Sequence, residues 1–217
     1  MKYIEKFHYI THDITHLSHI EQAQQACEAG AKWIQYRCLS KSDEELLQDI
    51  NAIAEICDDW GTTLIVTDHV HLYGKADIQG FHIEDMDADF IALRKLVGHD
   101  ITLGGSAHTV ENLVRLAKEG ADYVGYGPFA ETETKPNNYS HLGIEGYQHV
   151  VKALKAQAIT IPLLAVGGIK TYNVEALMQT GIYGIAVSGA INFADDFIEA
   201  YEDFYTLVNE NTSYGKR

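Results

Sequence analysis

Two kinds of hydrophobic pattern alternate along the chain. Short apolar runs rich in β-branched and aromatic residues predict strands, and longer runs with apolar residues at every third or fourth position predict amphipathic helices. The predicted strands are Phe7–Thr11, Trp33–Arg37, Thr63–Thr67, Gly80–Ile83, Ile101–Gly104, Tyr123–Tyr126, Pro162–Val166 and Gly184–Val187. The predicted helices are Ile20–Ala29, Asp43–Trp60, Asp89–Leu96, Val110–Glu119, Glu145–Ala156, Val174–Thr180 and Asp195–Val208. The connection at Val70–Ala76 has the weakest pattern of all.

This alternation predicts a closed parallel barrel. Strands that alternate with helices pair in parallel, because each helix carries the chain back to the starting edge of the sheet. The chain has 217 residues, and single α/β barrels commonly have about 200 to 250. Eight units without a linker therefore favour a single (β/α)8 TIM barrel over an open doubly wound sheet. We expect the barrel to span residues 1–208 and the polar tail at 209–217 to fray.

In such a barrel the active site lies at the carboxyl ends of the strands, and here nearly every strand ends in polar or glycine residues. The most informative segment is YVGYGPFAETETKPNN, residues 123–138. After its apolar start, a loop presents Thr132, Thr134 and Lys135. Small hydroxyl groups, backbone N–H groups and one ammonium group suit a phosphate, although an ordinary loop could have the same composition. Gly167–Gly168 and Ser188–Gly189 follow the last two strands, where many barrels bind phosphate on backbone N–H groups; tight turns would also need glycine there.

Three further groups at this rim are candidates for chemistry. Asp68 and Asp87 follow adjacent strands and could share Mg²⁺ with substrate phosphate oxygens, or each could cap a helix N-terminus. Arg37 could bind a phosphate with two hydrogen bonds, or could form an ion pair across the barrel. His108 could act as an acid or base, or could form a local hydrogen bond at the start of a helix.

Composition narrows the classes of partner. The net charge of −15 argues against nucleic acid and anionic membrane surfaces, both of which select basic patches. The three cysteines have no disulfide or zinc spacing and fit a reducing cytoplasm. We find no signal peptide and no apolar run long enough to cross a membrane. The expected partners are small phosphorylated molecules, and the sequence allows a homo-oligomer.

From Tyr9 to about Asp195 the chain resembles the thiamine phosphate synthase (thiamine-phosphate pyrophosphorylase) family. The most specific segments are GYGP followed by TETK-P, AVGGI at Ala165–Ile169 and IAVSGAI at Ile185–Ile191. Asp68 and Asp87, nineteen positions apart, also match the spacing of the family's metal-binding pair. The resemblance implies a (β/α)8 barrel that joins hydroxymethylpyrimidine pyrophosphate to thiazole phosphate. The products would be thiamine phosphate and pyrophosphate, and Mg²⁺ would be the cofactor.

The resemblance also implies roles for individual residues. Gln35 and Arg37 would contact the pyrimidine and its pyrophosphate, and Asp68 and Asp87 would bind Mg²⁺. Ser106 would lie near the reacting centre. Thr132, Thr134 and Lys135 would bind the thiazole phosphate and pyrophosphate. The backbone of Gly168, Val187 and Ser188 would close over the thiazole phosphate. Of these residues, the catalytic contacts would come from Arg37, Ser106 and Lys135.

Three positions depart from the family pattern. Leu39 replaces a usual lysine, Thr67 replaces an asparagine at the substrate-binding end of the third strand, and Glu84 replaces a glycine. Lys41 could reach back to replace the missing lysine. Two alternative functions are a thiazole tautomerase, which would use His108 and has no need of a lysine at position 39, and a phosphate-ligand-binding relative without turnover.

Overall fold

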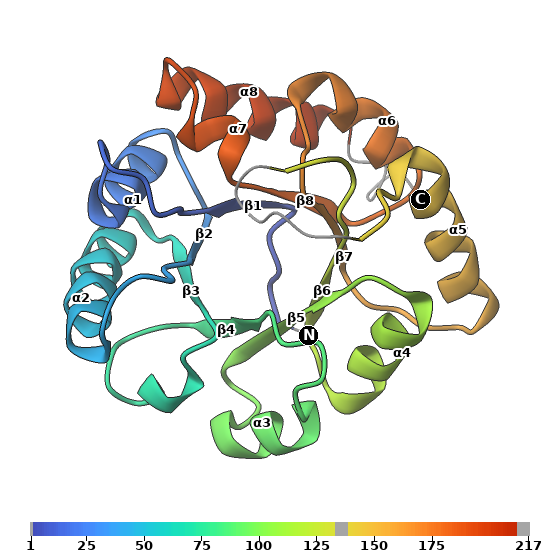
Figure 1. The fold of residues 1–217 in the computed structure, drawn as a ribbon, viewed down its shortest axis with the longest axis horizontal. Coiled ribbons are helices and arrows are strands. Elements are labelled where there is room, and N and C mark those ends of the chain that lie inside the picture. Colours follow the sequence, from blue (N-terminus) through green and yellow to red (C-terminus); the bar gives the residue numbers. More distant parts are fainter. Residues whose placement is uncertain (1, 133–138, 212–217) are drawn as a thin grey trace.

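The computed structural model describes residues 2–132 and 139–211. Eight parallel strands close into a barrel in sequence order, with β8 paired to β1, so the predicted fold class is confirmed. Figure 1 shows the strands as a central ring with the helices around it. The strands are β1 Phe7–Ile10, β2 Trp33–Tyr36, β3 Thr63–Thr67, β4 Gly80–Ile83, β5 Thr102–Ala107, β6 Tyr123–Tyr126, β7 Leu163–Val166 and β8 Gly184–Val187.

The helices begin and end at or near the predicted residues. They are α1 His19–Glu28, α2 Asp43–Trp60, α3 Phe90–Val97, α4 Val110–Glu119, α5 Gly143–Ala156, α6 Val174–Gln179, α7 Gly189–Asn192 and α8 Phe197–Glu210. Short 3₁₀ helices span Val70–Leu72 and Thr171–Asn173. The weak connection after β3 therefore holds a single tight turn, and α7 is an element that the sequence pattern did not indicate. The last helix continues to Glu210, two residues past the boundary predicted at 208.

Local sequence signals fix the helix ends. Ser18 and Ser42 each form a capping box with the glutamate three residues later, which satisfies backbone donors at the starts of α1 and α2. Gly61 and Gly120 end α2 and α4 in the left-handed conformation that glycine adopts without steric cost. The serines thus set where α1 and α2 begin, and the glycines set where α2 and α4 end and the chain turns toward β3 and β6.

The barrel has two layers of buried side chains. The larger core lies between strands and helices, and a smaller cluster fills the inside of the ring with Ile4, Trp33, Ile65, Tyr123 and Leu164. In Figure 1 the segment before β1 crosses the middle of the ring. A Cβ atom on Gly104 would lie 2.1 Å from Cζ of Tyr123, so glycine in β5 makes room for this aromatic floor. The floor leaves the opposite, carboxyl end of the barrel for a cavity.

Candidate active site

A cavity of about 840 Å³ opens at the carboxyl ends of the strands. Seven of the sequence-predicted site residues line it: Gln35, Arg37, Ser106, Thr132, Gly168, Val187 and Ser188. Thr67 lies just behind this lining, where its Oγ1 accepts a hydrogen bond of 2.9 Å from Nε2 of Gln35. Thr134 and Lys135 lie outside the described residues. The cavity therefore brings together residues in or just after strands on both sides of the barrel.

Arg37 forms a bidentate ion pair inside the cavity. Its Nε and Nη2 atoms donate to the two carboxylate oxygens of Glu84 at 2.9 and 3.2 Å. The two side chains are only 9% and 17% exposed, so little water screens the pair. The Arg37 backbone is also fixed, because its N–H donates to Oγ1 of Thr11. The ion pair across the barrel is thus the state of Arg37 in this structure.

Asp68 and Asp87 lie on consecutive loops. Asp68 has a φ of 54° and its Oδ1 accepts a hydrogen bond of 2.9 Å from the backbone of Glu84. Asp87 is exposed in the loop between β4 and α3. Their carboxylate oxygens are hard donors and fit Mg²⁺, which binds one or two carboxylates together with substrate oxygens. Neither aspartate belongs to a group of three or more metal-ligating side chains among the described residues.

His82 is a cavity residue that the sequence analysis missed. Its Nε2 lies 3.0 Å from Oγ of Ser106 and its Nδ1 lies 3.1 Å from the hydroxyl of Tyr123. The side chain is buried in β4 and reaches the cavity floor. Alternate residues of a strand share a face, so His82 could have been found as the polar inward neighbour of Glu84.

His108 and Tyr139 pack together at the edge of the cavity. The Nδ1–H group of His108 donates to the backbone carbonyl of Gly127. The ring lies against Tyr139, with 3.7 Å between the ring centroids. The local hydrogen bond that the sequence allowed for His108 is therefore present.

The loops after β6 and β7 approach each other closely. Gly168 has a φ of +70°, and a Cβ atom there would lie 2.3 Å from the backbone oxygen of Glu131. Only glycine permits both this conformation and this contact. Ser188 follows β8, and its Oγ accepts a hydrogen bond of 3.1 Å from Nδ2 of Asn192 in α7. This side of the cavity is thus built from tightly packed backbone.

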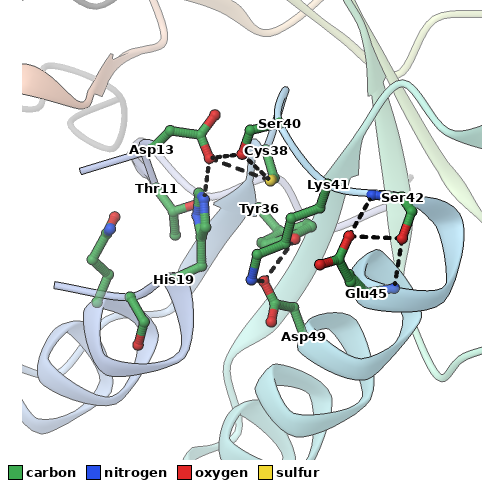
Figure 2. Close-up of polar contacts among 12 residues, drawn as sticks. Thr11, Asp13, His19, Tyr36, Cys38, Ser40, Lys41, Ser42, Glu45 and Asp49 are labelled. Carbon is green, nitrogen blue, oxygen red and sulfur yellow. Dashed lines mark hydrogen bonds and ion pairs between the residues drawn. The ribbon is translucent and has the colours of Figure 1, made fainter. Parts of the chain in front are cut away.

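Lys41 does not line the cavity. Its Nζ lies 2.6 Å from Oδ2 of Asp49 in α2, and the hydroxyl of Tyr36 donates to the same oxygen at 2.9 Å (Figure 2). Burial lowers the pKa of Lys41, but the hydrogen bond and charge of Asp49 outweigh burial and raise it. In this structure Lys41 is paired with Asp49 of α2, and neither Lys41 nor Leu39 lines the cavity.

Comparison with known proteins identifies relatives over nearly the whole chain. The family model for thiamine monophosphate synthase (TMP-TENI) matches residues 7–191. A thiamine-phosphate synthase of Bacteroides fragilis is 38% identical over 88% of this chain and 94% of its own length. One from Flavobacterium psychrophilum is 34% identical over 88% of this chain and 93% of its own length. The solved thiamine phosphate pyrophosphorylase of Pyrococcus furiosus superposes with a TM-score of 0.82 and 26% identity, covering 95% of this chain and 96% of that one.

No helix within the described part of the chain has both the length and the apolar character needed to cross a membrane.

Proposed function

Because this chain belongs to the thiamine monophosphate synthase family, a family of thiamine-biosynthesis transferases, we propose that its cavity joins hydroxymethylpyrimidine pyrophosphate to thiazole phosphate. The products are thiamine phosphate and pyrophosphate. The observation that carries this proposal is the cavity itself, which gathers Gln35, Arg37 and Ser106 from one arc of strands with Gly168 and Ser188 from another. Two phosphorylated substrates need two subsites, placed so that the reacting atoms of the bound substrates come within bonding distance.

The pyrimidine pyrophosphate binds on the β2–β4 side. Gln35, held by Thr67, contacts the pyrimidine, and Arg37 contacts the pyrophosphate. Asp68 and Asp87 would hold Mg²⁺, which when bound would neutralise charge on the pyrophosphate. Since Glu84 occupies two donor atoms of Arg37, the pyrophosphate must share or displace that carboxylate.

The thiazole phosphate binds on the opposite side. Backbone N–H groups around Gly168, Val187 and Ser188 bind its phosphate, together with the hydroxyl groups of Thr132 and Thr134. Lys135 adds the positive charge that an acidic chain needs locally for an anionic ligand. The close approach of the loops after β6 and β7, at Gly168 and Glu131, supports this assignment.

The reaction exchanges one bond for another. The C–O bond between the pyrimidine methylene and pyrophosphate breaks, and its electrons leave with pyrophosphate. The lone pair of the thiazole nitrogen then forms the new C–N bond. Arg37 and Lys135 stabilise charge on the leaving group, and Ser106 lies at the reacting centre, oriented by His82. No protein nucleophile takes part. We further propose that the protein works in the reducing cytoplasm, where its three free cysteines would stay reduced. The proposed reaction is compatible with either a monomer or a homo-oligomer.

The proposal is tested by an end-point assay with both substrates and Mg²⁺, in which thiamine phosphate is read by the fluorescence of its oxidised form. We expect product from the unmodified chain, and a loss of about 100-fold or more in Asp87→Ala. The matched control is Asp59→Ala, which removes an exposed aspartate at the end of α2 and should leave the rate unchanged. Binding of thiazole phosphate without product would refute the synthase and favour a tautomerase or a binding protein.

A further inference from the structure

A second cluster of chemically active side chains lies beside the cavity but outside its lining. Asp13 follows β1, His19 begins α1 and Cys38 follows β2, and their ligand atoms all lie within 4.8 Å of one another. Nε2 of His19 lies 2.9 Å from Oδ1 of Asp13, and Sγ of Cys38 lies 3.3 Å from the same oxygen. Figure 2 shows the three side chains pointing toward one another from separate segments. The proposed synthase reaction uses none of them.

We propose that Asp13, His19 and Cys38 form a zinc site. A thiolate, an imidazole and a carboxylate are the three ligand types that Zn²⁺ takes from proteins. With ordinary Zn–ligand bond lengths, the edges of a tetrahedral site are roughly 3.3 Å between N and O and roughly 3.5 Å between S and O. The observed separations are shorter by a few tenths of an ångström, so binding needs only a small outward movement.

The surroundings orient the ligands as a metal site requires. Nδ1 of His19 lies 2.7 Å from Oγ1 of Thr11, so its other ring nitrogen, Nε2, faces Asp13. The outer oxygen of Asp13, Oδ2, accepts a hydrogen bond of 3.0 Å from the backbone of Leu39. Metal-bound histidines and carboxylates are characteristically held by such partners on the side away from the metal.

Charge and access also agree with a zinc site. One thiolate and one carboxylate balance the two charges of Zn²⁺, so binding leaves no net charge among the buried His19 and Cys38 side chains. The thiol proton leaves to the solvent as the ion enters. Asp13 is 31% exposed and provides the access route. Oγ of Ser40 lies 3.1 Å from Oδ1 of Asp13, and it could hold a water that completes the coordination of the ion.

The ion would have a structural role at the rim. It would tie the loop after β1 to the end of β2, directly after Arg37 in the sequence. Thr11 links the two sites, because the hydroxyl that holds His19 also accepts the backbone N–H of Arg37. Zinc would therefore fix the backbone that presents Arg37 to the cavity without contacting the substrates.

The test is a titration of the full chain, reduced and stripped of metal, with Zn²⁺ in competition with a chromogenic chelator. We expect one Zn²⁺ per chain, and a thiolate-to-metal charge-transfer band when Co²⁺ replaces it. Cys38→Ser should abolish the band and the tight binding, and Thr11→Val should weaken binding about 10- to 100-fold. Cys57→Ser, which changes a buried cysteine of α2 outside the cluster, should retain both.

A competing location is the exposed group of Asp43, His69 and His71. Binding that is lost in His71→Ala but kept in Cys38→Ser would overturn the proposal. So would the absence of tight binding, or tight Co²⁺ binding without the thiolate band. The band is measured on the unmodified chain, so this last result does not depend on whether any variant folds.

Discussion

The two sides of the cavity handle charge in opposite ways. On the β2–β4 side, the cation that lines the cavity, Arg37, is already paired with the Glu84 carboxylate of the same chain. On the β6–β8 side, the described lining is mostly small residues and closely packed backbone around Gly168 and Ser188. Under the proposed function, one side would exchange an internal ion pair for its ligand, whereas the other would bind its ligand on backbone that is already closely packed. The two sides should therefore fail in different ways when altered.

The largest effect is expected from Gly168→Ala. The new Cβ atom would clash with the Glu131 backbone oxygen, and the residue would keep a positive φ that alanine disfavours. We expect the loops after β6 and β7 to separate, with a loss of about 1 to 3 kcal/mol in the free energy of unfolding and of about 100-fold in kcat/KM. Chemical unfolding and steady-state kinetics measure both.

Gly74→Ala is the matched control for this change. Gly74 also has a positive φ, of +78°, but a Cβ atom there would meet nothing within 4 Å. It should show the conformational cost alone and leave kcat/KM unchanged. Equal kinetic losses in the two variants would show that the contact with Glu131 does not matter.

A smaller effect of opposite sign is expected from Glu84→Gln. This change keeps the shape of the side chain but removes the charge that competes with pyrophosphate for Arg37. We expect the KM for the pyrimidine pyrophosphate to fall by about tenfold, which corresponds to about 1.4 kcal/mol, within the range for a charge-assisted hydrogen bond. Glu119→Gln, which removes a carboxylate paired with Arg115 in α4, should leave KM unchanged. A higher KM in Glu84→Gln would mean that Glu84 assists binding.

His8 in β1 stacks on Trp33 of the aromatic floor, with 4.2 Å between the ring centroids, and should make the stability of the fold depend on pH. Complete burial lowers the pKa of His8 well below 6.5, the hydrogen bond to the Glu5 carbonyl opposes this shift, and the charge of His82 adds to it. Because the folded-state pKa is depressed, the stabilising contribution is present above pH 6.5 and is lost as pH falls toward the folded value. Between pH 6.5 and 5.5 the free energy of unfolding should fall less steeply with falling pH in His8→Phe than in the unmodified chain. The difference in slope should be up to about 1.4 kcal/mol per pH unit. The control variant His16→Phe replaces an exposed histidine and should change this slope less than His8→Phe does.

The smallest effect on activity is expected from Lys41→Met. Since Lys41 pairs with Asp49 away from the cavity, kcat/KM should change by less than about twofold, while stability falls by about 1 kcal/mol. A large fall in kcat/KM without loss of stability would show instead that Lys41 moves to the pyrophosphate during the reaction.

Much of the fold could be predicted from sequence because its signals are local. The apolar run that ends at Thr67 and the serine caps of α1 and α2 each act over a few residues. The prediction for β5 stopped too early, at Gly104, because Gly105 and Ser106 have the composition of a loop. Their pairing with Val124 and Gly125 of β6 makes them part of the strand.

The site was less predictable because its interactions are not local. Arg37 and Glu84 are 47 residues apart and lie just beyond β2 and just beyond β4, with β3 between those strands, so no sequence period reveals their pairing. Lys41 and Asp49 are only eight residues apart, but Lys41 precedes α2, so the helical period does not indicate their pairing. The hydroxyl of Tyr36 donates to the same Asp49 oxygen. The roles of all the predicted site residues, Asp68, Asp87, Thr134 and Lys135 among them, stay predictions.

The central claim is that two subsites of different construction bind the two substrates. The most direct measurement is a calorimetric titration of each ligand separately, inorganic pyrophosphate with Mg²⁺ and thiazole phosphate, into the unmodified chain, Glu84→Gln and Gly168→Ala. We predict a crossed pattern, in which Glu84→Gln strengthens only pyrophosphate binding and Gly168→Ala weakens mainly thiazole phosphate binding. Parallel changes in both affinities in either variant would contradict the division of the cavity into two subsites.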